Sequence, residues 1–249
     1  MKRRIVGGVA VAIAFACVGS SAAVAAPAGG YAVFAQCPTQ AAQANGCLYA
    51  PVEGGYIALG KTVVPIAKTV VLQAGLLEEE APFVKHLAGA LDGDTLTRVG
   101  QTLPGGLFGL PLEAVTELAA PASSIALSSK PLGLVLPIKV RLVNPLLGSE
   151  CSVGSNLHPI ELNLTTGTSG GLAGNNGTQR TIEQGGILLK SGVAMVSGGF
   201  AVPKATGCGS TLVDEALDAK LGLPSSNNRI VFDLKMEIAN SELVEESEG

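Results

Sequence analysis

The chain alternates short runs of apolar residues with turns rich in Gly, Pro and Ser, a pattern typical of antiparallel β proteins. The clearest alternation covers residues 134–143, where Lys139 and Arg141 are interleaved with apolar residues. Pro137 interrupts this strand and cannot donate to a ladder, so we expect the strand to lie at an edge or bulge. Residues 229–238 alternate in the same way and predict a final amphipathic strand.

The remaining patterns predict several more strands and one helix. Ser210 or Thr211 is a candidate cap for a helix over residues 211–221, which ends with Lys220 and Gly222. The further strands are expected at 56–59, 62–65, 69–73, 159–165, 187–190 and 192–200. Two segments, 76–91 and 112–119, have mixed patterns that leave helix and other structure open.

These elements predict a mainly β fold, an antiparallel β-sandwich or a jelly-roll-like arrangement, with one short helix near 211–221. No internal repeat or linker divides the chain. We therefore expect one β-rich domain over residues 26–240. The acidic residues 241–249 are expected to form a flexible tail.

The first 25 residues have the pattern of an export signal. Three basic residues at 2–4 precede an apolar run at 5–18, and the small residues 23–25 read Ala-Val-Ala, an A-x-A cleavage site. The alternative is an uncleaved anchor, because this segment is about long enough to span a bilayer. Cleavage after residue 25 predicts a secreted, extracellular or cell-envelope-associated protein with no transmembrane segment in its mature part.

Four cysteines remain after the signal: Cys37, Cys47, Cys151 and Cys208. An even number in an exported chain predicts structural disulfides rather than a metal or catalytic site. Three pairings are open. We prefer Cys37 with Cys47, which closes a short turn-rich loop, and Cys151 with Cys208, which joins two turns rich in Gly and Ser.

Composition narrows the possible functions. Charged residues make up 14% of the chain and hydrophobic residues 47%, which provides for a large core. Loss of the three basic signal residues leaves 13 basic against 20 acidic residues, a net charge of −7, so nucleic acid is not an expected partner. Trp is absent and aromatic residues are only 4%, which disfavours stacking platforms for sugars or bases.

A G-x-S-x-G sequence surrounds Ser169, but turn residues follow it where a nucleophile elbow needs a helix. The order of α/β-hydrolases also requires a histidine after the serine, and none follows His158. The order of chymotrypsin would use His86, then Asp92 or Asp94, then Ser169. His86 has no recognisable catalytic context. The sequence therefore predicts no catalytic residue.

Metal and cofactor sites are not indicated either. Asp92-Gly93-Asp94 offers two carboxylates, but the following residues lack the remaining ligands of a calcium loop, so a solvated turn is the preferred interpretation. His86 and His158 are too far apart in sequence to form a metal motif. Asn163 and Asn176 begin glycosylation sequons in form.

Several blocks resemble uncharacterised secreted proteins of actinobacteria. They include Cys37-Pro38, Val64-Pro65-Ile66, Leu136-Pro137-Ile138-Lys139-Val140, Asn144-Pro145-Leu146-Leu147-Gly148 followed by Cys151, and Gly207-Cys208-Gly209. The resemblance covers most of the mature chain and weakens between residues 76 and 120. It implies a secreted protein with structural cysteines, and it implies no substrate or catalytic residue.

The preferred hypothesis is a secreted, non-catalytic extracellular or cell-envelope β protein that acts in surface recognition or as a structural component. Its partner would be a cell-wall or other extracellular surface component. One alternative is an extracellular carrier that holds a small apolar ligand between its sheets. The other is a secreted hydrolase built on Ser169 or on an acidic pair.

Overall fold

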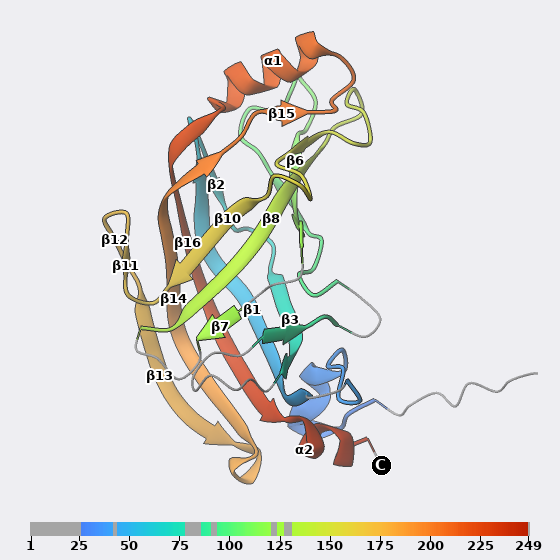
Figure 1. Cartoon of the computed structure of the whole chain (residues 1–249), viewed down its shortest axis with the longest axis vertical. Helices are drawn as coiled ribbons and strands as arrows, with labels where there is room; N and C mark the ends of the chain where they lie inside the picture. The colour runs from blue at the N-terminus through green and yellow to red at the C-terminus, as the bar shows by residue number, and fades with distance from the viewer. Residues whose placement is uncertain are drawn as a thin grey trace, which may run out of the picture.

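The computed structural model describes residues 26–41, 44–77, 86–90, 94–120, 124–126 and 131–248. The expected signal, residues 1–25, and Asp92 lie outside this part. The described chain forms a mainly β, antiparallel sandwich (Figure 1). None of its described helices has both the length and the apolar composition needed to cross a bilayer.

The longest strands form one layer. They are β1 (Ala44–Leu59), β14 (Ile187–Val202) and β16 (Ser225–Asn240), with β16 in the middle and both neighbours antiparallel to it. On the outer side of β1 lie β3 (Val70–Leu77) and β2 (Thr62–Pro65). The layer is completed by β4 (His86–Ala88) beside β3 and by β13 (Asn175–Ile182) beside β14.

The second layer is built around β8 (Gly133–Val143), which crosses in front of the first layer (Figure 1). Its neighbours are β10 (Ile160–Thr165), β6 (Glu113–Leu118), β7 (Ser124–Ala126) and β9 (Ser152–Val153). Two short strands extend it, β5 (Gly100–Thr102) beside β6 and β15 (Ala205–Thr206) beside β9. The layers are hydrogen-bonded at one corner, where Thr165 of β10 pairs with Val196 of β14.

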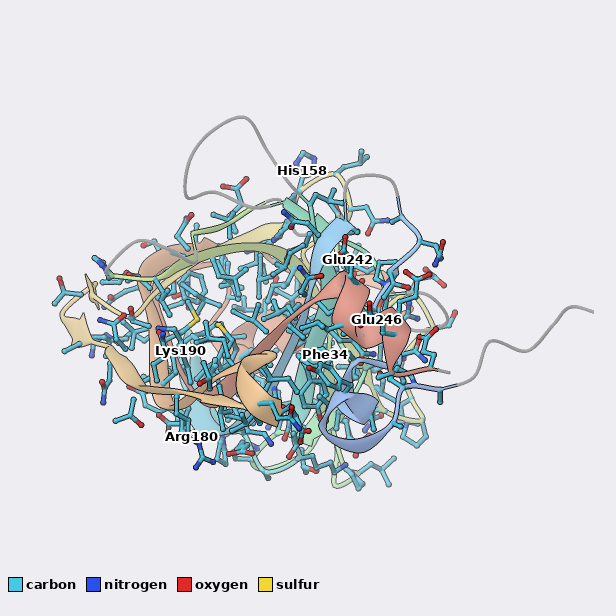
Figure 2. All side chains as sticks on the ribbon, turned by 90° about the horizontal axis from the view of Figure 1, so that it is seen from below. Phe34, His158, Arg180, Lys190, Glu242 and Glu246 are labelled. Carbon is cyan, nitrogen blue, oxygen red and sulfur yellow. A yellow bond between two sulfur atoms is a disulfide. The ribbon has the colours of Figure 1, made fainter. Side chains whose placement is uncertain are left out.

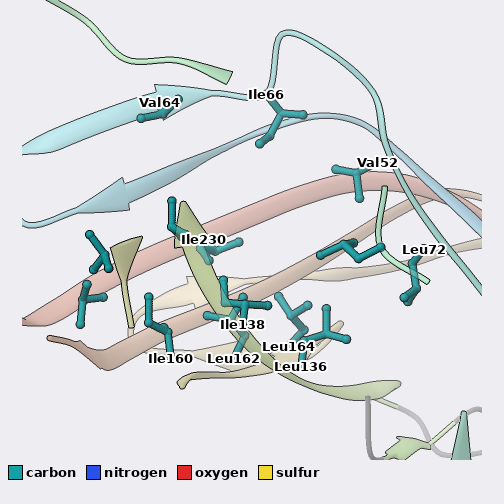
Figure 3. Packing of buried hydrophobic residues seen from close by; sticks show 14 of the residues in the cluster. Val52, Val64, Ile66, Leu72, Leu136, Ile138, Ile160, Leu162, Leu164 and Ile230 are labelled. Carbon is teal, nitrogen blue, oxygen red and sulfur yellow. The ribbon is translucent and has the colours of Figure 1, made fainter. Parts of the chain in front are cut away.

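The core lies between the two layers because each strand alternates apolar and polar residues. On β8, Leu134, Leu136, Ile138, Val140 and Leu142 are buried, and the intervening residues face outward. Ile160, Leu162 and Leu164 of β10 and Ile230 of β16 meet them between the sheets (Figure 3). The period-2 pattern of the sequence therefore translates directly into one apolar interior.

From Pro137 we expected β8 to lie at an edge or a bulge, but β8 has a neighbouring segment on each side of this residue. Pro137 lies opposite Glu161 of β10, and its carbonyl accepts from the N–H of Ala119, 2.9 Å away, on the other side. That side is the gap between the register of β6, which ends at Ile138, and that of β7, which begins at Val135. A missing N–H at this position removes no regular ladder bond, so the proline is accommodated inside the sheet.

The predicted helix is confirmed as α1 (Thr211–Leu221). The side chain of Ser210 accepts from the N–H of Val213, and Gly222 closes the helix in the left-handed conformation at φ 74°. Ser at the N-cap and Gly just after the last turn are the usual sequence signals for these two ends.

The tail expected to be flexible is instead ordered over most of its length. Residues Ser241–Glu246 form α2, capped by the Asn240 side chain, which accepts from the N–H of Glu242. Val244 is fully buried against the sandwich, and Ser241 donates to the carbonyl of Ala44. The sequence did not indicate this contact, because Leu243 and Val244 are the only large apolar residues in a segment that otherwise consists of glutamates and serine.

Four short elements remain. A small hairpin of β11 (Thr168–Ser169) and β12 (Leu172–Ala173) projects beside β14, and two 3-10 helices, η1 (Gly29–Phe34) and η2 (Glu183–Gly185), lie at the opposite end from α1.

Candidate functional site

The four cysteines pair as preferred from the sequence. Cys37 is bonded to Cys47, with 5.6 Å between their Cα atoms, and Cys151 to Cys208, with 4.1 Å. All four are buried. The two bonds lie at opposite ends of the sandwich, the first near η1 and α2 and the second near α1.

At the first end, the disulfide between Cys37 and Cys47 lies in a small apolar cluster formed by η1, β14 and α2. Phe34 of η1, Ile187 of β14 and Val244 of α2 pack with Cys37 and Cys47 into a second apolar cluster, separate from the main core. Figure 2 looks onto this end and shows Phe34 close to α2, which carries Glu242 and Glu246. Apolar side chains of this end are thus removed from solvent.

At the second end the bond ties loops to one another. We define the loop end as residues 103–112, 143–151 and 203–212. Besides the bond from Cys151 to Cys208, the N–H of Gly148 donates to the carbonyl of Cys208 at 3.3 Å. The N–H of Cys208 in turn donates to Oδ1 of Asp214 in α1, 3.0 Å away. The turn after β8 is therefore held against the start of α1.

Asn144, in segment 143–151, holds segment 103–112 in place. Its side chain is buried, and Nδ2 donates to the carbonyl of Pro111 at 2.7 Å while Oδ1 accepts from the N–H of Leu146 at 2.9 Å. Lys220 reaches the same segment from α1, since its Nζ donates to the carbonyl of Gly105 at 3.4 Å. Segment 143–151 is thus joined to 203–212 by the disulfide and a hydrogen bond and to 103–112 by the side chain of Asn144, and α1 holds 103–112 through Lys220.

Several large apolar side chains of the loop end are exposed to solvent. Phe108 is 67% exposed, Leu146 57% and Leu212 76%, and Leu110 and Val143 are exposed to a smaller degree. These five are among only eight large hydrophobic residues that the described chain exposes, so the exposed apolar residues gather on the loop end. A concentration of this kind marks an interaction surface more often than scattered single residues do.

The backbone at Phe108 strengthens this interpretation. Its φ is 50°, a left-handed conformation that glycine adopts without cost and a bulky residue rarely adopts. Gly105, Gly106 and Gly109 in the same turn also have positive φ. A glycine at position 108 would suit the turn better, so the aromatic ring is present despite the backbone conformation. Residues held in this way cluster at binding sites.

The candidate catalytic residues that the structure describes lie outside the loop end. Ser169 lies on β11, and its Oγ accepts from the N–H of Gly198 at 3.1 Å, a contact that fixes the small hairpin to β14. Asp94 pairs with Arg98, its Oδ1 2.9 Å from Nε. His158 lies in a turn in which its N–H donates to Ser155 Oγ. The side chain of His86, like Asp92, is outside the described part of the chain.

The sequons are both in strands. Asn163 is exposed on β10, and Asn176 lies on β13, where its Oδ1 accepts from Thr166 Oγ1 at 2.6 Å.

A buried carboxylate on the outer side of β6 has a structural role. Glu117 accepts from Nε of Arg141 at 2.8 Å and lies 3.6 Å from Nζ of Lys139. Burial raises the pKa of Glu117, but the hydrogen bond and charge of Arg141, with the charges of Arg98 and Lys139, outweigh it and leave the pKa below its ordinary value. The residue therefore stays ionised and joins β6 to β8.

The interior contains two adjoining apolar cavities of about 40 Å³ each. Ile57, Ile138 and Leu162 line both of them. Gln101 also lines both, but its side-chain oxygen accepts from the N–H groups of Ala67 and Lys68 and its amide donates to the carbonyl of Lys68. Ligand pockets usually have volumes of roughly 300–1,000 Å³, so each cavity is much smaller than a site for a lipid-like ligand.

Sequence reasoning missed the loop end. Its apolar residues lie in Gly- and Pro-rich segments that carry neither helical nor strand periodicity, such as 104–111, which reads Pro-Gly-Gly-Leu-Phe-Gly-Leu-Pro. A usable signal would have been the density of Leu and Phe in a segment whose turn residues exclude it from a regular element.

Comparison with known proteins returned no matching family model, no matching curated protein and no matching solved structure.

Proposed function

We propose that this protein is an exported, non-catalytic recognition protein of the cell envelope or extracellular space. In this proposal the loop end binds a cell-wall or other extracellular surface component that offers an apolar contact. The observation that carries the proposal is the gathering of Phe108, Leu110, Val143, Leu146 and Leu212 on cross-linked loops.

The physical reason is that a recognition surface needs apolar groups that are both exposed and fixed. Each exposed apolar side chain gains free energy when a partner removes it from water, and little ordering entropy is lost if its loop is already held in place. The disulfide and the side chain of Asn144 provide that restraint. Two buried disulfides also fit an oxidising compartment, which supports the exported location.

The test is a binding assay with the mature protein and envelope fragments of the producing cell. The triple variant F108S/L146S/L212S is compared with the native chain by co-sedimentation. We expect about a tenfold or greater loss of binding, since three exposed anchors contribute more than about 1.4 kcal/mol together.

The matched control is Leu157→Ser, which removes an exposed leucine, 85% accessible, from a turn outside the loop end. It should bind as the native chain does. Equal binding of the native chain and the triple variant would overturn the proposal. So would equal losses in the triple variant and in Leu157→Ser.

A second candidate is the carrier of a small apolar ligand, favoured by the two adjoining interior cavities. To accept such a ligand they would have to merge and widen by displacement of shared residues such as Ile138 and Leu162. Native mass spectrometry of protein from its own culture supernatant tests this directly. A small apolar molecule present only in the native spectrum supports the carrier, and a bare protein mass counts against it.

A further inference from the structure

If the loop end binds a surface component, as the proposed function requires, its residues also indicate the chemistry of that component. The exposed apolar side chains come from all three segments of the loop end: Phe108 and Leu110, Val143 and Leu146, and Leu212. Exposed apolar patches mark either protein partners or membranes. The charge, the backbone hydrogen bonds and the position of the loop end distinguish between these two kinds of partner.

The loop end carries very little charge. Segments 103–112 and 143–149 contain no Asp, Glu, Lys or Arg, and the whole loop end contains one residue of each sign, Glu150 and Lys204. A protein interface normally has a polar rim with hydrogen bonds to the partner. These two segments offer few side-chain groups for such a rim, whereas the acyl chains of a lipid layer require none.

The backbone of segment 103–112 pairs with itself. The N–H of Leu107 donates to the carbonyl of Leu110 at 2.8 Å, and the N–H of Leu110 donates back to the carbonyl of Leu107 at 2.9 Å. A third bond runs from the N–H of Leu103 to the carbonyl of Leu112 at 2.8 Å, and the two prolines of the segment have no N–H to satisfy. Because unpaired backbone groups are strongly unfavourable in hydrocarbon, this pairing lowers the cost of contact with a lipid layer.

The reciprocal pair of bonds closes a two-residue turn with Phe108 and Gly109 at its tip. Both tip residues have positive φ, 50° and 80°, as in the type I′ turns of β-hairpins. A Cβ added at Gly109 would meet no atom within 4 Å, so the tip stands clear of the rest of the described chain. A projecting tip needs a matching pocket on a protein partner, whereas acyl chains rearrange around it.

The position of the loop end suits contact with a flat surface. In Figure 1, α1 and β15 lie at one end of the longest axis of the molecule, opposite the end that carries α2. Leu212 precedes the buried Leu221 by about two and a half helical turns, so it lies on the opposite side of α1 and faces away from the core. The end of the molecule can therefore touch a surface while the sandwich remains in water.

We propose that the loop end inserts into a lipid layer of the envelope, and that acyl chains are the apolar component it recognises. The inserted side chains include Phe108 at the turn tip, Leu146 and Leu212. Insertion is shallow, about 5–10 Å into the boundary between head groups and acyl chains. At this depth water and head groups remain within reach of the loop backbone and of Glu150 and Lys204.

The charge of the chain restricts which lipids should be bound. The loop end has no cluster of basic residues of the kind that binds anionic head groups. The chain after residue 25 has 13 basic against 20 acidic residues, a net charge of −7. Binding to phosphatidylcholine vesicles should therefore be at least as tight as binding to vesicles that contain anionic lipid. It should change less than about twofold when the salt concentration is raised from about 0.05 to about 0.5 M.

The first test is flotation of residues 26–249 with two kinds of vesicle, one of phosphatidylcholine and one of the lipids extracted from envelope fragments. The native chain should float with both. F108S/L146S/L212S should lower the partition coefficient by about tenfold or more, because it removes three inserted apolar groups. The matched control Leu157→Ser changes an 85% exposed leucine outside the loop end and should float as the native chain does. Circular dichroism checks that both variants retain the fold.

A single tryptophan can report insertion directly, because the native chain contains none. Phe108→Trp should retain vesicle binding. Its emission should shift to shorter wavelength when vesicles are added, and lipids brominated on the acyl chain should quench it. The matched control Leu157→Trp should show neither effect.

Failure of the lipid assignment is distinguishable from failure of the proposed function. Flotation that the triple variant loses supports the assignment, and absence of flotation on both kinds of vesicle, or flotation that the triple variant retains, overturns it. If the triple variant nevertheless binds envelope fragments less than the native chain, the loop end is still the recognition surface, and a protein or a wall polymer is its partner. If the triple variant binds fragments as the native chain does, the proposed function itself is wrong.

Discussion

Each end of the sandwich contains one disulfide, but the two disulfides secure different kinds of segment. Near α2, the bond between Cys37 and Cys47 secures a segment whose apolar residues are buried. Near α1, the bond between Cys151 and Cys208 secures loops whose apolar residues are exposed. Phe34 at one end and Phe108 at the other illustrate the difference, since the first is 2% and the second 67% exposed.

The same types of apolar residue therefore have different roles at the two ends, and the difference is whether folding buries their side chains. At the α2 end the apolar groups stabilise the fold because folding removes them from water. At the loop end equivalent groups contribute little to folding, so their free energy remains available for a partner. Substitutions at the two ends should therefore separate stability from binding.

The largest expected difference is between the two phenylalanines. Phe34→Ala should lower the free energy of unfolding by about 3–5 kcal/mol, as for other buried aromatic truncations. Phe108→Ala should change it by less than about 0.5 kcal/mol. Guanidinium unfolding followed by circular dichroism measures both. Similar losses for the two variants would remove the contrast between the ends.

Removal of each disulfide sharpens the same comparison. Replacing Cys151 and Cys208 by Ser should cost roughly 4 kcal/mol, and replacing Cys37 and Cys47 roughly 3, because the longer loop restrains the unfolded chain more. Where both variants fold, envelope binding should fall in the first and be retained in the second. Loss of binding in the second pair alone would point to the α2 end as the binding surface.

Much of the sandwich could be predicted because its strands keep a simple alternation. The predicted strand 134–143 is β8, and β16 contains the predicted 229–238. The first part of β1 was missed because Gly46, Pro51 and Gly54 interrupt it. So was β13, because a polar strand exposed on both faces has no apolar alternation to detect.

The loop end, the proposed binding surface, could not be predicted for a related reason. Phe108 and Leu146 lie in turns, and the sequence does not state whether a turn's apolar residue is buried or exposed. That depends on contacts between distant segments, such as the hydrogen bond from Asn144 to the carbonyl of Pro111. The disulfide pairing was predictable because the turns around Cys151 and Cys208 already indicated chain reversals.

A smaller effect is expected at Glu117, which belongs to neither end. Glu117→Gln should cost about 2 kcal/mol at neutral pH, since it removes a hydrogen bond between charged groups at a buried site. Glu113→Gln, at an exposed pair with Lys68, is the matched control and should cost less than about 1 kcal/mol.

The pH dependence has a defined sign. Because the folded pKa of Glu117 lies below its ordinary value of 4.5, its stabilising contribution is present above that pH and is lost as the pH falls through the folded pKa. The stability difference between the native chain and Glu117→Gln should therefore shrink on acidification below about pH 4.5. A difference that stays constant in acid would contradict the assignment.

A smaller loss of stability than at Glu117 is expected at Asn144. Asn144→Ala should cost about 1–2 kcal/mol, because the N–H of Leu146 and the carbonyl of Pro111 lose their partner. Asn144→Asp keeps the acceptor for Leu146 but sets a buried carboxylate oxygen against the carbonyl of Pro111 in place of the donor. Envelope binding should fall in both variants. Full binding by Asn144→Ala would show that the loops need no such restraint.

The most direct measurement of the central claim is amide hydrogen exchange of the native protein with and without envelope fragments, read by mass spectrometry. If the loop end is the recognition surface, added fragments should slow exchange in peptides covering residues 103–112, 143–151 and 203–212. Peptides covering 29–41 and 241–248, at the other end, should be unchanged. Protection confined to that other end, with none at the loop end, would contradict the account.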